Sequence, residues 1–174
     1  MGKSSDVINI VLECLSEMSK VIPMPFETPY AHVKRMRRIE YGAYSHSMRE
    51  LQKRGTVSII SKNGQKFLKL TRKGELQILL EKACLPKLGV WDGKWRLVVF
   101  DIPEDAKDKR FIFRRLLKRN NFYKLQASVY ISPYALNREA VQYLEKSGLI
   151  NYIRILRVDE MDNDGAIRKR FGLK

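Results

Sequence analysis

The feature that most constrains the fold is a pair of β-rich runs, TVSIIS and KFLKLT, on either side of the dipeptide Asn63-Gly64. Asn-Gly between such runs is among the strongest sequence signals for a β-hairpin, because both residues tolerate the positive φ angles of a tight turn. Helical periodicity resumes directly after the hairpin, in RKGELQILLEKA. The first half of the chain therefore predicts a hairpin that leads into a helix.

Three helical segments are predicted before the hairpin. The first, SSDVINIVLECLSEM, begins with serines and an acid that suit an N-cap and continues with apolar residues at helical spacing. A shorter segment, YAHVKRMRR, and a third, YGAYSHSMRELQKRG, follow, and Gly55 closes the third in the usual position after a helix. Three helices, a hairpin and a helix form the element order of a winged helix-turn-helix. We assign this module to residues 1–84.

The third helix of such a module fits the major groove of DNA, whose base edges carry a readable pattern of donors and acceptors. Tyr44, Met48 and Leu51 form the inward stripe of this helix, so its opposite side faces solvent. We expect base contacts from Ser45, His46, Arg49 and Gln52, phosphate contacts from Lys53, Lys62 and Lys66, and backbone contacts from Arg35 and Arg38 in the preceding basic cluster. The alternative for each of them is an ordinary solvated surface.

Positive charge is the main functional signal of the composition. The 34 Lys and Arg residues against 19 Asp and Glu give a net charge of +15. Both halves are basic, with 16 basic and 8 acidic residues in 1–88 and 18 and 11 in 89–174. A surplus of this size indicates a nucleic acid or another anionic surface as the partner. A highly charged solvated surface without such a partner is the alternative.

The cysteines and the hydropathy argue against disulfide-rich, zinc-ribbon and membrane-spanning proteins. Cys14 and Cys84 are far apart and lack a Cys-x-x-Cys motif, so the sequence supports neither a disulfide framework nor a zinc ribbon. No apolar run approaches the ~20 residues of a spanning helix, and there is no signal peptide. We therefore expect a cytoplasmic protein that has no membrane partner.

The second half alternates strands with helices. After a linker at 85–93 come a strand WRLVVFDI, a helix at about 106–119, strands near FYKLQ and ASVYIS, a helix at about 137–147 and a strand NYIRILRV. This βαββαβ order is that of a ferredoxin-like domain, which we assign to 94–160 and follow with a basic tail at 161–174. The predicted fold class is α+β, with the winged helix-turn-helix followed by the ferredoxin-like domain.

The first helix of this second half has one basic side. Lys107, Arg110, Arg114 and Lys118 share it, opposite an apolar side. This stripe is consistent with phosphate binding and equally with a solvated helix face.

The segments WDGKWRLVVFDIPED and NNFYKLQASVYISP resemble the central region of the PaaX-type family of transcriptional repressors. That region is similar to the small ferredoxin-like subunit of the CRISPR adaptation complex, a nuclease relative. Full-length PaaX repressors carry a further C-terminal domain, whereas this chain ends at Lys174, so we expect a short form. The resemblance implies a dimeric regulator that binds double-stranded DNA and needs no cofactor. The sequence does not identify a small-molecule effector.

Asp101 raises the question of enzymatic activity. By position it matches the acid that binds a divalent cation in the CRISPR-associated relatives. One carboxylate is a poor site for Mg²⁺ or Mn²⁺, and only a dimer would supply a second. We expect Asp101 to be structural, accepting backbone N–H groups where the strand passes into the helix, with no catalytic or metal-binding residue in the chain.

The sequence thus predicts a sequence-specific DNA-binding transcriptional regulator, a repressor, that dimerises through the ferredoxin-like domain. The alternative is a divalent-metal-dependent nuclease that uses Asp101 at the dimer interface.

Overall fold

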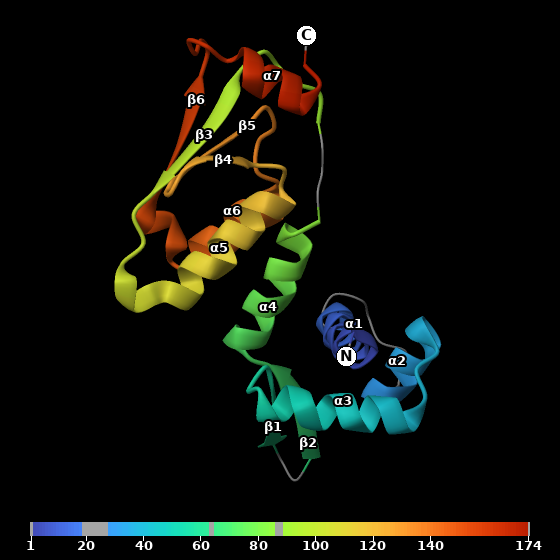
Figure 1. Ribbon diagram of the computed structural model, residues 1–174. Helices are drawn as coiled ribbons and strands as arrows, with labels where there is room; N and C mark the ends of the chain where they lie inside the picture. Colours follow the sequence, from blue (N-terminus) through green and yellow to red (C-terminus); the bar gives the residue numbers. More distant parts are fainter. Residues whose placement is uncertain (1, 19–27, 63–64, 86–88, 174) are drawn as a thin grey trace. The chain divides into compact units, whose positions relative to one another are not determined.

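The chain forms two compact units, Met1–Ile78 and Leu79–Lys174. A computed structural model describes residues 2–18, 28–62, 65–85 and 89–173 (Figure 1). The division between the units falls inside helix α4, upstream of the linker expected at 85–93. The predicted α+β class and the predicted order of elements are both confirmed.

The first unit contains three helices, a hairpin and most of a fourth helix. The elements are α1 (Gly2–Met18), α2 (Pro29–Arg37), α3 (Tyr41–Lys53), β1 (Val57–Lys62), β2 (Gln65–Leu70) and α4 (Arg72–Ala83). The two strands pair antiparallel, from Val57 opposite Leu70 to Lys62 opposite Gln65. The hairpin is thereby confirmed, while its Asn63-Gly64 turn lies outside the described residues.

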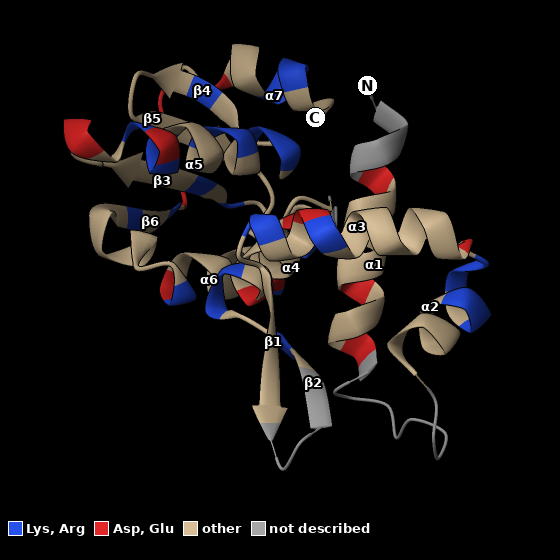
Figure 2. Ribbon diagram, turned by 90° about the horizontal axis from the view of Figure 1, so that it is seen from below, with Lys and Arg blue, Asp and Glu red and all other residues tan. Residues whose placement is uncertain are grey.

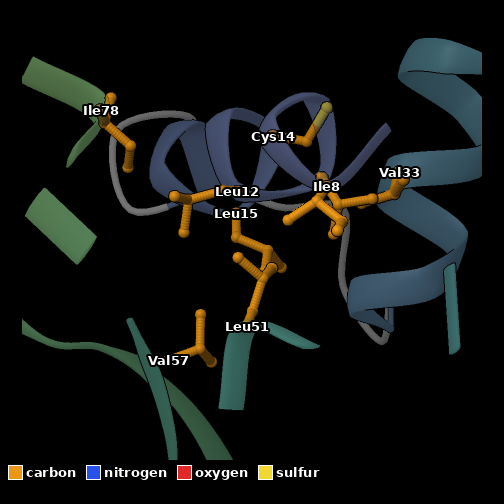
Figure 3. Packing of buried hydrophobic residues seen from close by; sticks show 9 residues of the cluster. Ile8, Leu12, Cys14, Leu15, Val33, Leu51, Val57 and Ile78 are labelled. Carbon is orange, nitrogen blue, oxygen red and sulfur yellow. The ribbon is translucent and has the colours of Figure 1, made fainter. Parts of the chain in front are cut away.

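The core of the first unit is built around α1. Ile8, Val11, Leu12 and Leu15 recur at helical spacing and are buried, because this spacing places them on one side of the helix. They pack with one residue or more from each of α2, α3, β1 and α4, as Figure 3 illustrates. Cys14 belongs to the same cluster and is a free thiol.

The second unit is a four-stranded antiparallel sheet with helices. Its elements are β3 (Trp95–Phe100), α5 (Lys107–Arg119), β4 (Tyr123–Gln126), β5 (Val129–Ser132), α6 (Arg138–Lys146), β6 (Ile153–Val158) and α7 (Gly165–Phe171), with short 3₁₀ helices at Glu104–Ala106 and Leu149–Tyr152. The strand order is β4-β5-β3-β6, so the two strands that are central in space are the first and third in sequence. This is the ferredoxin-like arrangement that the sequence predicted.

Helices α5 and α7 contact opposite faces of this sheet. Phe100 meets Phe113 of α5 edge-on, with the ring centroids 5.0 Å apart. Trp95 lies five positions before Phe100 on β3, so alternation turns it to the other face. There its Nε1 donates to Asp164 at 3.1 Å and its ring lies 6.1 Å from Phe171 of α7. The segment expected as a basic tail at 161–174 therefore contains a packed helix.

A pair of buried asparagines fixes the end of α4 within the second unit. Asn120 and Asn137 both donate to the carbonyl oxygen of Ala83, at 2.7 and 3.1 Å. Asn137 also donates to Leu85 O at 3.0 Å and to Asn120 Oδ1 at 3.0 Å. Its own Oδ1 accepts the Ala140 N–H at 2.7 Å and so caps α6. These contacts satisfy carbonyl groups that the C-terminus of α4 would otherwise leave unpaired.

Candidate nucleic-acid interface

Helix α3 presents one face to the core and one to solvent. Leu51 is fully buried, and Tyr44 and Met48 pack against the core cluster, so the predicted inward stripe is confirmed. Ser47 is also buried and donates to the carbonyl of Ala43 at 2.8 Å, which satisfies its hydroxyl inside the helix. The inner side of α3 is therefore fixed by packing.

The predicted DNA-contacting residues lie on the outer side of α3. His46, Arg49 and Lys53 are exposed, and Ser45 and Gln52 are partly exposed. Ser45, Arg49 and Gln52 follow the i, i+4, i+7 spacing of a single helix face. Within the part of the chain that the structure describes, Arg49 and Lys53 have no carboxylate partner, whereas nearby Glu50 pairs with Arg54 at 3.9 Å. Both cations are therefore available to an external anion, and Figure 2 shows basic segments on this helix.

The C-terminus of α3 is joined to the base of the hairpin. Gly55 has a φ of 68°, which ends the helix in the left-handed conformation that glycine adopts without strain. Its N–H donates to Gln52 O, and the Thr56 N–H donates to Leu51 O. The hydroxyl of Thr71, just before α4, donates to Gly55 O at 2.7 Å and accepts the Gly74 N–H at 3.2 Å. The outer face of α3 is thus held at a fixed position relative to the strands.

The basic cluster of α2 is exposed, as expected, and one of its arginines has internal contacts. Thr28 caps α2 by accepting the Ala31 N–H at 3.2 Å. Arg35 is exposed, yet its Nη2 lies 3.3 Å from Nδ1 of the buried His32. Arg38 is exposed at the end of the helix, with a left-handed φ of 53°. Both predicted backbone-contacting residues therefore lie at the surface, and Arg35 is positioned by His32.

The predicted hairpin lysines lie on the two strands of the hairpin. Lys62 ends β1 and Lys66 is the second residue of β2. Their side chains lie outside the described part of the structure, so their role stays a prediction.

Sequence reasoning missed an aromatic residue at the N-terminus of α3. Tyr41 is 63% exposed, and its ring meets that of Tyr30 edge-on with centroids 5.1 Å apart. Tyr30 also contacts the ring of Tyr44, at 5.3 Å. Recognition helices contact bases with their N-terminal residues, so Tyr41 is a further candidate contact. Its position as the first residue of the predicted helix was the available signal.

The structure corrects the expectation for the Asp101 side chain. Its backbone N–H donates to Tyr152 O at 2.9 Å. The carboxylate is exposed and accepts no hydrogen bond from any described residue, so it does not serve as an acceptor for backbone N–H groups. The polypeptide turns away from the strand here through Pro103, and Arg110 rather than Asp101 stabilises the junction by donating to Ile102 O at 2.5 Å.

A divalent cation does not fit Asp101 within one chain. Mg²⁺ and Mn²⁺ prefer several oxygen ligands in a defined geometry. In the described ranges, no three His, Cys, Asp or Glu side chains come together where they could hold a metal ion. A site at Asp101 would need ligands from a second copy of the chain.

The basic stripe of α5 divides into two groups. Arg110 pairs with Glu104 at 2.5 Å, and Arg114 donates to Ala127 O at 3.1 Å while its guanidinium lies 5.9 Å from the centre of the Phe100 ring. These two arginines support the fold. Lys107 and Lys118 are exposed and have no such contacts among the described residues.

Comparison with known proteins concerns the second unit. None of the helices that the structure describes is long and apolar enough to cross a membrane. No curated protein and no solved structure matches the chain. A family model described as the PaaX protein central Cas2-like domain matches residues 89–168, which include the whole four-stranded sheet and helices α5 and α6. Residues 89–168 are therefore similar to the central Cas2-like domain of PaaX proteins.

Proposed function

We propose that the protein is a transcriptional repressor of the PaaX type that binds double-stranded DNA in a sequence-specific manner. The observation that carries this proposal is the outer face of α3, where Arg49 and Lys53 lie exposed beside Ser45 and Gln52 and pair with no carboxylate of the described residues. An arginine can donate two parallel hydrogen bonds to guanine O6 and N7. The hairpin and α2 belong to the same unit as α3, and we expect them to contact the phosphates of the duplex.

Pairing of two copies is part of the proposal. A single module of this kind buries only roughly 600–1,000 Å² on DNA, and two half-sites bound together increase both affinity and specificity. The edge strand β6 carries apolar side chains that a partner could cover, since Ile155 is 43% and Leu156 46% exposed. We place the pairing surface on this edge of the Cas2-like unit.

The experiment begins with selection of a binding sequence from a random duplex library by the wild-type protein. Arg49→Ala should weaken binding to the selected duplex by about 1–3 kcal/mol and reduce its preference over unselected duplex, because a base contact is lost. Fluorescence anisotropy at fixed salt measures both affinities. Lys109→Ala is the control, since it removes one exposed positive charge from the other unit. Unchanged sequence preference in Arg49→Ala would overturn the proposal.

The same duplex tests the nuclease alternative. Incubation with Mg²⁺ or Mn²⁺ should leave the selected DNA intact, and Asp101→Ala should bind it as the wild type does. Metal-dependent cutting that disappears in Asp101→Ala would replace the repressor by an endonuclease.

A further inference from the structure

Two adjoining depressions lie at the edge strand β4 of the Cas2-like unit. Lys118 and Lys124 line both of them, Arg170 lines the first, and Arg115 lines the second. No Asp or Glu is among the described residues that line either depression. We call Arg115, Lys118, Lys124 and Arg170 the β4-edge groove.

The groove combines residues from three elements. Lys118 lies in the last turn of α5, where a positive charge also suits the helix dipole. Lys124 lies on β4, which is the edge of the sheet and exposed along its length. Arg170 belongs to α7, and its guanidinium lies 4.2 Å from the centre of the Tyr123 ring. This stacking holds the Arg170 charge beside the strand while its N–H donors stay at the surface.

The cations of the groove differ from several other basic residues of this unit in having no ion-pair partner among the described residues. Four basic residues elsewhere in it form ion pairs, Lys94 with Asp159, Arg96 with Asp92, Arg110 with Glu104 and Arg168 with Asp164. Within the described residues, the four groove cations have no carboxylate partner. Like charges that lie close together without a counter-ion repel one another. Binding of an anionic ligand would reduce this repulsion.

We infer that the β4-edge groove binds the sugar-phosphate backbone of duplex DNA, as a second contact separate from the α3 face; this rests on the proposed function. An extended polyanion fits an open surface that spans a helix end, an edge strand and a second helix. The groove cations are all exposed at least in part, and such a surface lacks the enclosed polar groups that select a small anion. The contact contributes affinity without choosing sequence.

The double variant Lys118→Gln/Lys124→Gln tests this inference in the full chain. The slope of log K against log salt concentration should fall in magnitude by roughly 1.8, because each lost phosphate contact removes about 0.9. The preference for selected over unselected duplex should not change. Anisotropy titrations over a series of salt concentrations give both quantities, and circular dichroism checks that the variant is folded.

Lys107→Gln/Lys109→Gln is the matched control. Both residues are exposed on α5, the variant loses the same charge, and neither residue lines the groove. Its salt slope should stay close to that of the wild type. If the two double variants lower the slope equally, net charge alone explains the effect and the inference is wrong.

The outcomes separate this inference from the proposed function. If Arg49→Ala loses sequence preference while the groove variant keeps the wild-type slope, the groove is not a DNA contact and the repressor proposal stands. If the groove variant lowers the slope while Arg49→Ala keeps full preference, the chain binds DNA through the groove without reading sequence through α3.

Discussion

At the scale of single residues, Asn137 has three structural roles, and the sequence predicts only one of them. It caps α6, it satisfies the carbonyls of Ala83 and Leu85, and it bonds to Asn120. The sequence predicted a helix beginning near 137, and asparagine is a favoured N-cap. The partners of its amide group could not be predicted, because they lie on segments more than 15 residues away in the chain.

Replacement of this asparagine should destabilise the second unit. Asn137→Ala removes the cap, which costs about 1 kcal/mol, and leaves buried carbonyl groups unpaired, so we expect a total loss of about 2–4 kcal/mol. Urea unfolding followed by circular dichroism measures the change. Asn151→Ala is the control, because Asn151 is exposed and should change stability by less than about 0.5 kcal/mol. Equal effects of the two variants would contradict the assigned role.

At the scale of elements, helix α4 begins in close contact with the backbone that follows α3. A Cβ atom on Gly74 would lie 2.2 Å from Thr56 O and 2.8 Å from Leu70 Cδ1. Thr56 O accepts the Thr71 N–H at 3.1 Å, so the backbone at Thr56 cannot move away without losing a hydrogen bond. Glycine is therefore required here by space, in a helix where alanine would otherwise be preferred.

Substitution of two different glycines by alanine should therefore change the free energy of unfolding in opposite directions. Gly74→Ala should destabilise the first unit by about 1–3 kcal/mol through overpacking. Gly42→Ala in α3 meets nothing within 4 Å and should stabilise it by up to about 1 kcal/mol through helix propensity. Thermal unfolding of the two variants gives the comparison, and a stabilising Gly74→Ala would show that the α4 contact is looser than described.

The order of the elements could be predicted because periodicity and turn residues are local signals. Helix α7 could not be predicted, because its few apolar residues show no clear stripe. It is stabilised instead by contacts with Trp91 and Trp95, which lie far earlier in the chain. The outer face of α3 could be predicted, because all residues of this face belong to one helix and helical periodicity is a local signal. The β4-edge groove was not, because Lys124 and Arg170 come together only through the sheet and α7.

At the scale of the whole molecule, we expect two copies of the chain to associate through β6, so that the protein is a dimer in solution. The chain has a mass of 20.4 kDa, and we expect about twice this value in sedimentation equilibrium at micromolar concentration. Leu156→Lys should yield monomers, because a lysine at the centre of an edge strand opposes pairing. Val90→Lys is the control, because Val90 is 97% exposed and is not part of this strand, so the change should leave the mass unchanged. A monomeric wild type would rule out the proposed pairing.

The two free cysteines have a consequence for how the protein responds to oxidants and thiol reagents. Burial raises the pKa of both the Cys14 and the Cys84 thiol above the ordinary value. At neutral pH each sulfur is therefore protonated and reacts slowly, since only the thiolate is strongly nucleophilic. Cys14 is buried in the core of the first unit, so its alkylation becomes fast only when that unit opens, whereas the partly exposed Cys84 of the second unit can be alkylated in the folded chain; the rate at Cys14 therefore reports opening of the first unit without an added label.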